Sequence, residues 1–348
     1  MSPRSNPRPG SVTIYDVAIF AGVSHQTVSR VINKASHVAA PTRARVLEAV
    51  SLLGYRPNNV ARNLVSRRSN LIGVITFCQD SFGPSHLLIS VDTAAMKSGY
   101  NTLLASVTEP TVKAIKRAAD DLRTHGVEGI ILNVPTAVDL SSLREVFRQI
   151  PYVATDAGAG NEITMVTTDH EYGACIGTEH LIEFGHRQIA CISGPLDWRC
   201  GLLRRDGWRR TLRKYGIPEG PSIVGEWSAN GGFVAAEELI KHCPNRFTAI
   251  VAGNDQMALG VMRALSLHGL SVPGHVAVVG YDDMPEAAFF NPSLTTVTHD
   301  FETAGRTCLE FLLRLIRDPH APAERRVIKP ELVRRESTAI KSHPAYTR

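Results

Sequence analysis

The sequence predicts an N-terminal all-α helix-turn-helix head, followed by an α/β body of two doubly wound parallel-sheet lobes. Two observations lead to this fold class. Residues 11–56 contain short amphipathic helical segments around a glycine turn, whereas residues 70–338 alternate apolar strand-like runs with amphipathic helical stretches. Such alternation is typical of parallel sheets joined by right-handed helical crossovers. At 348 residues, 43% of them hydrophobic and 20% charged, the chain can bury a sizeable core in two or three domains.

The beginning of the chain and its cysteines narrow the class of protein. Residues 1–10, MSPRSNPRPG, contain no apolar run, so we expect a disordered basic arm and not a secretory signal. No stretch of about 18 apolar residues is present that would span a membrane. The six cysteines include no CxxC pair, which favours reduced thiols in a cytoplasmic protein.

The positive charge is concentrated in the head. Residues 1–68 hold ten Lys or Arg and two acidic residues, a balance of +8, whereas the remainder holds 28 basic and 31 acidic residues, a balance of −3. A basic head on a slightly acidic body is the electrostatic signature of a nucleic-acid-binding module. Charge alone leaves a plain solvated surface equally open.

Three short helices are expected in the head. Their spans are 13–20, 24–33 and 41–53, with a tight turn at AGVS (21–24) between the first two. Thr13 and Ser24 carry hydroxyls that cap helix N-termini, and Gly54 ends the third helix. The inward apolar positions are Ile14, Val17, Ala18, Val28, Val31, Ile32, Val46, Leu47 and Val50. Two helices joined by a short glycine turn and braced by a third form a helix-turn-helix.

The exposed face of the second helix carries side chains suited to double-stranded DNA. In a helix-turn-helix this helix enters the major groove N-terminus first. Gln26 can bond adenine bidentately and Arg30 can bond guanine, while hydroxyls and the helix N-terminus suit phosphates. The residues expected to contact DNA are Thr13, Tyr15, Ser24, His25, Gln26, Thr27, Ser29, Arg30 and Asn33. An ordinary polar helix face is the alternative, but the turn, the helices and the charge together favour DNA.

Motifs along almost the whole chain resemble the lactose repressor family of bacterial transcription regulators. They are residues 12–50 (VTIYDV to LEAV), GYRPNNVARNL (54–64), GEWSANGGF (225–233), AGNDQMALGVMRAL (252–265) and VAVVGYDD (276–283). The similarity covers about residues 11–338 and is strongest to the repressor after which the family is named. It implies a homodimeric repressor of carbohydrate-utilisation genes, whose operator affinity a small sugar, most simply a galactoside, lowers. It also implies a body that resembles periplasmic sugar-binding proteins.

The motifs and the resemblance together suggest five segments. They are a disordered basic arm (1–10), the helix-turn-helix domain (11–56), a hinge helix and linker (57–69), the two-lobed effector-binding and dimerisation domain (70–338) and a short tail (339–348).

The stretch PNNVARNL, residues 57–64, matches the hinge helix of the family. At about eight residues it is shorter than the ~12–15 residues at which an isolated helix becomes marginally stable. By resemblance it folds only when paired with its twin from a second subunit on DNA. Leu64 then resembles the apolar wedge that kinks the minor groove, with Asn58 and Ala61 as groove contacts. A plain linker is the alternative.

Polar residues follow the apolar strands of the body. The expected strands are LIGVITF, TLLAS, GIILN, YVATD, IACISG, TAIVAG and VAVVGYD. Ligands of such folds bind at the carboxyl ends of parallel strands, where acceptors and donors can grip hydroxyls. The resemblance assigns effector binding to Ser81, Pro84, Asp156, Arg204, Trp227, Asn254, Asp282 and Phe301. Singly, each has a structural alternative: Asn254 can cap a helix, and Trp227 can be core.

Several positions depart from the namesake of the family. Glu109 stands where that protein has a basic site residue, Cys200 replaces a serine, and His299 replaces a glutamine. On the recognition helix, His25 replaces a tyrosine. These departures leave the effector and the operator sequence open.

Other classes of function have weaker support. No glycine-rich dinucleotide fingerprint follows a strand and no GxSxG elbow occurs, so we expect neither a nucleotide cofactor nor an enzyme. His170, Cys175 and His180 are spaced by five, whereas metal ligands on one helical face need three or four, so we expect no metal. A solute-binding transport protein would share the body fold, but it would carry a signal peptide and lack the head.

The last residues bear on assembly. After Ser337 only TAIKSHPAYTR remains, with no leucine heptads. In the namesake of the family such heptads tie dimers into tetramers, so a dimer is expected here.

Overall fold

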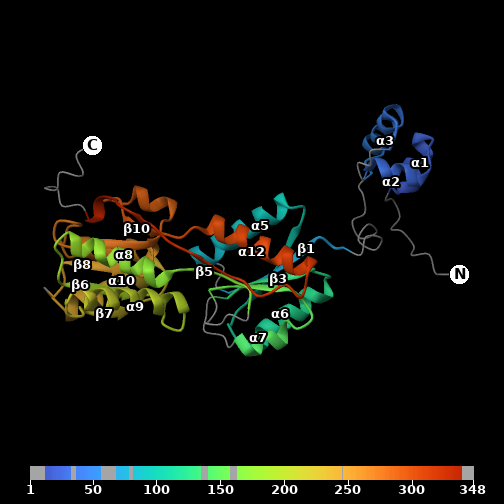
Figure 1. Cartoon of the computed structure of the whole chain (residues 1–348). Helices are drawn as coiled ribbons and strands as arrows, with labels where there is room; N and C mark the ends of the chain where they lie inside the picture. The colour runs from blue at the N-terminus through green and yellow to red at the C-terminus, as the bar shows by residue number, and fades with distance from the viewer. Residues whose placement is uncertain are drawn as a thin grey trace. The chain divides into compact units, whose positions relative to one another are not determined.

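The computed structural model describes residues 12–32, 37–55, 68–77, 81–134, 140–156, 163–244 and 246–338. Its contacts divide the chain into two compact units, residues 1–69 and 70–348, which are treated separately below (Figure 1). No helix in the described ranges is long and apolar enough to cross a membrane.

The head is a three-helix unit. Its helices are α1 (Ile14–Ala21), α2 (His25–Ile32) and α3 (Ala40–Leu53). Thr13 and Asp16 form a capping box at the start of α1, and Gly22 and Gly54 end α1 and α3 in the left-handed conformation. The buried core is Val17, Ala18, Ala21, Val28, Val31, Val46 and Ala49. The expectation that Leu47 faces inward is wrong, because its side chain is 51% exposed and Ala49 takes the buried position.

The first lobe of the body is a six-stranded sheet with helices on both faces. Its strands, in the order β11-β5-β4-β3-β1-β2, are parallel. Their bounds are β1 Leu71–Phe77, β2 Asn101–Val107, β3 Gly129–Asn133, β4 Tyr152–Thr155, β5 Met165–Thr168 and β11 Arg325–Ile328. Helices α5 (Phe82–Lys97) and α12 (Phe301–Arg317) cover one face, and α6 (Val112–Thr124) and α7 (Leu140–Val146) cover the other.

The second lobe repeats this architecture. Its strand order is β12-β10-β9-β8-β6-β7, and only the β10–β12 pair of this described sheet is antiparallel. The strands are β6 Ile189–Ser193, β7 Ser222–Val224, β8 Ala249–Ala252, β9 Ala277–Asp282, β10 Thr295–Thr298 and β12 Leu332–Val333. Helices α10 (Ala229–His242) and α11 (Asp255–Leu267) cover one face, and α8 (His170–Glu183) and α9 (Arg199–Lys214) the other. Two 3-10 helices, Pro285–Phe289 and Glu336–Thr338, complete it.

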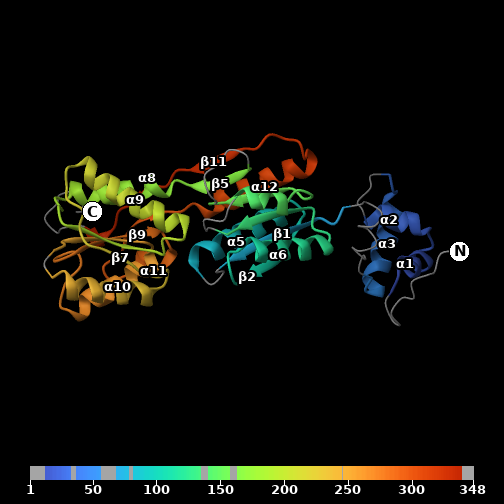
Figure 2. The same cartoon turned by 90° about the horizontal axis from the view of Figure 1, so that it is seen from below.

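Three segments cross between the lobes, and they position the pocket described below. They join β5 to α8, β10 to α12 and β11 to β12 (Figures 1 and 2). The seven predicted strands are all present. Strands β5, β7, β10, β11 and β12 were missed, because each is at most four residues long and none has more than two consecutive apolar residues.

Candidate functional site

Of the six described residues at the start of α2 and along it that were predicted to contact DNA, four are exposed. Ser24, His25, Gln26 and Arg30 are exposed, whereas Thr27 and Ser29 are partly buried. The Ser24 hydroxyl accepts a hydrogen bond from the Thr27 backbone N–H at 3.2 Å and so caps α2.

Two further predicted contacts lie on or next to α1. Tyr15 is 61% exposed, and its ring lies 5.1 Å from that of His25. Thr13 donates its hydroxyl to Asp16 in the capping box. The predicted contacts Asn33, Asn58, Ala61 and Leu64 lie outside the described residues.

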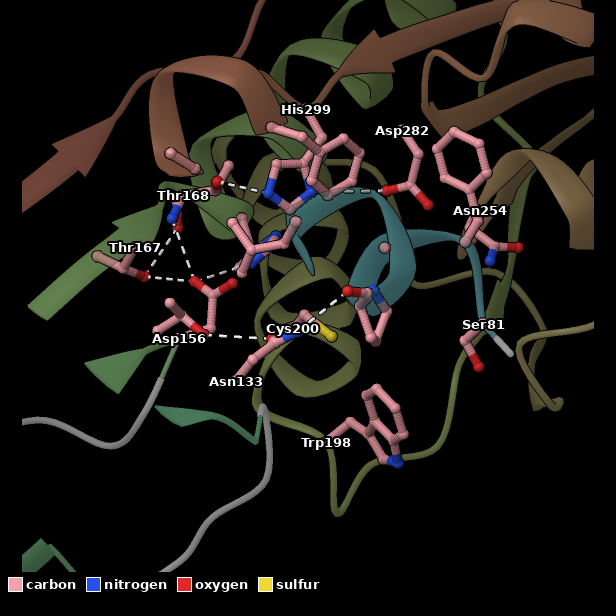
Figure 3. Close-up of a pocket in the computed structure, with 18 of the residues that line it drawn as sticks. Ser81, Asn133, Asp156, Thr167, Thr168, Trp198, Cys200, Asn254, Asp282 and His299 are labelled. Carbon is pink, nitrogen blue, oxygen red and sulfur yellow. Dashed lines mark hydrogen bonds and ion pairs between the residues drawn. The ribbon is translucent and has the colours of Figure 1, made fainter. Parts of the chain in front are cut away.

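A pocket opens in the body between the two lobes. All eight predicted effector residues line it: Ser81, Pro84, Asp156, Arg204, Trp227, Asn254, Asp282 and Phe301. Asp156 follows β4 in the first lobe and Asp282 ends β9 in the second, and Figure 3 shows their carboxylates on opposite sides of the pocket. Both have positive φ angles, 45° and 106°, which turn the chain sharply at the strand ends. Such backbone conformations concentrate at functional sites.

Other lining residues were missed by the sequence analysis. They include Phe82, Asn133, Thr155, Thr167, Thr168, His170 and Trp198. Asn133 ends a predicted strand, so its position was a signal that went unused. Thr168 and His170 gave no such signal, because β5 was not predicted and His170 was considered only as a metal ligand.

Arg204 is buried and engaged by protein groups on several sides. Its Nη1 donates to the Gly253 carbonyl at 2.7 Å and its Nη2 to Asp282 Oδ1 at 3.1 Å. Its guanidinium also lies 3.6 Å from the centre of the Tyr281 ring. Burial opposes the charge on Arg204, but Asp282 outweighs it and raises the pKa of the guanidinium. The arginine therefore stays charged, with its charge already paired.

Asp156 accepts two hydrogen bonds through one oxygen, and an imidazole lies beside the same oxygen. Its Oδ1 receives the Thr167 hydroxyl at 2.7 Å and the Thr168 backbone N–H at 3.1 Å, and His170 Nε2 lies 3.3 Å away. Burial alone would raise the pKa of Asp156, but the imidazole of His170 and the hydrogen bonds hold it well below its usual range. The carboxylate is therefore ionised.

His170 joins Asp156 to Arg204. Arg204 Nε donates to His170 Nδ1 at 3.4 Å. Since an arginine has no acceptor, Nδ1 has to be unprotonated, and the ring proton sits on Nε2 toward Asp156. Burial lowers the pKa of His170, which agrees with a neutral imidazole.

His299 and Asp282 form the opposite wall. His299 Nδ1 lies 3.8 Å from Asp282 Oδ1, and its Nε2 lies 2.9 Å from the Thr168 hydroxyl. Burial alone would raise the pKa of Asp282, but Arg204 and His299 keep it below its usual range. Among the described residues, the Oδ2 atoms of Asp156 and Asp282 have no hydrogen-bond partner. Each carboxylate thus keeps one free acceptor.

Aromatic rings form the apolar part of the pocket. Phe301 stacks on His299 with ring centres 3.9 Å apart and meets Phe82 edge-on at 5.8 Å. Trp198 and Trp227 pack in a T shape at 5.8 Å. Apolar faces beside paired carboxylates and an amide can hold a small ring that carries hydroxyls.

Comparison with known proteins places the chain in a family. A model of the lacI family of bacterial regulatory proteins matches residues 13–58, and a model of the periplasmic binding protein-like domain matches residues 178–338. The lactose operon repressor of Escherichia coli (strain K12) is 37% identical over 330 residues, covering 94% of this chain and 91% of the relative. This chain belongs to the lacI family. It is a DNA-binding transcriptional repressor, as the motif resemblance implied.

Two further lacI-family relatives bear on fold and effector. The ribose operon repressor of Escherichia coli (strain K12) is 34% identical over 331 residues, covering 93% of this chain and 99% of the relative. A crystal structure of the lac repressor dimer bound to operator and an anti-inducer has a TM-score of 0.86 at 36% identity, covering 95% of this chain and 100% of that chain. These lacI-family relatives are repressors of operons for different sugars, so membership does not identify the effector.

The three body positions that differ from the lactose repressor lie in different parts of the structure. Cys200 and His299 line the pocket, and burial raises the pKa of the Cys200 thiol to about 12, which keeps it protonated. Glu109 is exposed and lines a separate groove beside β2 and α6. Two of these three departures thus line the pocket, and the third does not.

Proposed function

We propose that this repressor acts as a homodimer, binds operator DNA through α2 and the stretch 57–64, and is released by a small neutral sugar. A galactoside is the first candidate, and the regulated genes are those of carbohydrate utilisation. The names of the lactose and ribose operon repressors support a sugar, and the dimer in the similar lac repressor structure supports a dimer. Within the stretch 57–64, Asn58, Ala61 and Leu64 are the proposed minor-groove contacts.

The free Oδ2 atoms of Asp156 and Asp282 carry the proposal of a sugar. They offer acceptors from opposite lobes, and the buried Trp227 Nε1 has no described partner and offers a donor. A sugar ring supplies several hydroxyls that both donate and accept, and its C–H face can lie against Phe301. Two buried acceptors and a donor would each lose about 1–3 kcal/mol if a ligand left them unpaired.

The charges of the pocket favour a neutral ligand. Asp156 and Asp282 are both ionised, and the only cation among the described lining residues that stays charged regardless of pH, Arg204, is already paired. A phosphate or carboxylate would therefore lie near uncompensated negative charge in a partly buried site. A neutral sugar avoids this repulsion.

Release requires that the sugar prefer one arrangement of the lobes. A ligand that bonds Asp156 and Asp282 together favours the lobe angle that suits both. If that angle does not support paired hinge helices, operator affinity falls. Coupling is typically about 1–3 kcal/mol per site, so two sites in a dimer can lower operator affinity by a hundred-fold or more.

Calorimetric titration of the whole protein tests the effector class. We expect galactose or its methyl glycoside to bind, and galactose 6-phosphate to bind at least ten-fold more weakly. An operator-binding assay with and without the same sugar then tests release. Tighter binding of the phosphate ester than of its parent sugar would contradict the neutral-ligand proposal, and binding without any change in operator affinity would contradict the release mechanism.

A further inference from the structure

Six residues form a closed ring of contacts that spans both lobes. In order they are Asp156, Thr168, His299, Asp282, Arg204 and His170. The successive separations are 3.1, 2.9, 3.8, 3.1, 3.4 and 3.3 Å, the first of them to the Thr168 backbone N–H. Figure 3 shows Thr168 and His299 side by side and Asp282 beyond His299. The ring therefore connects the two carboxylates of the pocket through protein groups alone.

Two contacts in this ring fall short of hydrogen bonds. His170 Nε2 and His299 Nδ1 are buried and make no well-formed hydrogen bond, although each lies within 4 Å of a carboxylate oxygen. The carboxylates concerned, Asp156 and Asp282, are those whose Oδ2 atoms have no hydrogen-bond partner among the described residues. A ligand that turned either carboxylate by bonding its Oδ2 would change these two contacts.

The link between His299 and Thr168 reaches the segments that join the lobes. Thr168 is the last residue of β5, where the chain crosses to α8, and His299 follows β10, where the chain crosses to α12. Their contact at 2.9 Å fixes one crossing segment to the other. A change in the lobe angle has to preserve or break this contact.

We propose that His299 is a positioning residue that transmits the movement of Asp282, caused by the effector, to Thr168 and thereby to the crossing segments. The imidazole suits this role because its two nitrogens face different partners, Asp282 through Nδ1 and Thr168 through Nε2. The sugar in this inference comes from the proposed function, but the contact between His299 and Thr168 is present without a ligand.

Three variants test the two contacts of His299, with Thr168 and with Asp282, separately. Thr168→Val removes the hydroxyl at nearly constant volume. His299→Asn keeps a polar group near the Nδ1 position and loses the reach to Thr168, whereas His299→Gln keeps the reach and loses the contact with Asp282. The matched control is Thr178→Val, since Thr178 is a buried threonine whose hydroxyl bonds only the Ala174 carbonyl of its own helix.

The first readout is operator affinity with and without the galactoside used in the titration. We expect Thr168→Val and His299→Asn to lose about ten-fold in the ratio of the two operator affinities, with each variant measured at a galactoside concentration that saturates it. The double variant Thr168→Val/His299→Asn should lose no more of this ratio than either single variant, because both substitutions remove the contact between His299 and Thr168. A wild-type ratio in Thr168→Val, or equal losses in Thr178→Val, would overturn the proposal.

The second readout needs no sugar. Nitrogen resonances of the full-length protein labelled with 15N-histidine report hydrogen bonding at each ring nitrogen. Thr168→Val should shift the His299 signals and leave His170 with an unprotonated Nδ1. Unchanged His299 signals show that the link does not exist. If the link is present but no galactoside changes wild-type operator affinity, the proposed effector fails instead.

Discussion

On α2 the candidates for reading bases, Gln26 and Arg30, are exposed, whereas in the pocket Arg204 is buried and contacts the buried side chains of Asp282 and His170. Gln26 and Arg30 extend into solvent, while Arg204 and His170 are at most 8% exposed. Removing a DNA-reading side chain should therefore affect only its ligand. Removing a pocket side chain should affect the ligand and the fold together, because its partners are left buried without compensation.

The largest expected effect is that of Arg204→Ala. It leaves Asp282 buried without its cation, and breaking a buried ion pair from one side costs about 3–5 kcal/mol. We expect a loss of that size in the free energy of unfolding, measured with urea, and no measurable binding of a galactoside. Head contacts with DNA should persist at temperatures where the variant is folded. A variant as stable as wild type would show that the pocket side chains do not depend on one another in this way.

A smaller effect is expected for Arg30→Ala in the head. The loss of a bond to a base edge should weaken binding to the specific operator by about 1–3 kcal/mol and relax the preference at one base pair. Because Arg30 is exposed, the free energy of unfolding should change by less than about 0.5 kcal/mol. Fluorescence anisotropy with specific and random duplexes measures this. An equal loss of affinity for both duplexes would show that Arg30 contacts phosphates and not a base edge.

The effect that is smallest at neutral pH concerns a buried histidine away from both surfaces. His180 Nε2 lies 2.8 Å from the Thr338 hydroxyl, and burial lowers the pKa of His180 from 6.5 to about 4. The unfolded chain then binds a proton between these values that the folded chain does not, so stability should fall as the pH falls from about 6.5 to about 4. His180→Gln keeps a group that reaches Thr338 and cannot titrate. Urea unfolding at pH 7 and pH 5 should show a shallower pH dependence for the variant, and identical slopes would refute the assignment.

The sequence predicted the exposed face of α2 more completely than the pocket. The exposed face of α2 on which the DNA contacts are predicted follows from helical periodicity and from a turn a few residues away, so the local pattern is sufficient to predict that face. Asp156, Asn254 and Asp282 were predictable because each follows an apolar strand. The ring through Thr168, His170 and His299 was not, since its partners are up to 131 residues apart and meet only where the crossing segments meet. Leu47 was misplaced because α3 has an apolar residue on more than one face.

The positive φ angles of Asp156 and Asp282 also restrict how this repressor can evolve. Among residues with a β-carbon, aspartate and asparagine accept such angles most readily, and a β-branched residue does not. Most substitutions at either position would therefore lose both the backbone turn and the carboxylate. Asparagine and glycine would keep the turn. A lineage that acquires a new effector is expected to hold these two positions nearly constant. Its changes should accumulate at pocket positions with ordinary backbone, such as Ser81, Cys200 and His299, which makes them the positions to randomise when the repressor is adapted to another sugar.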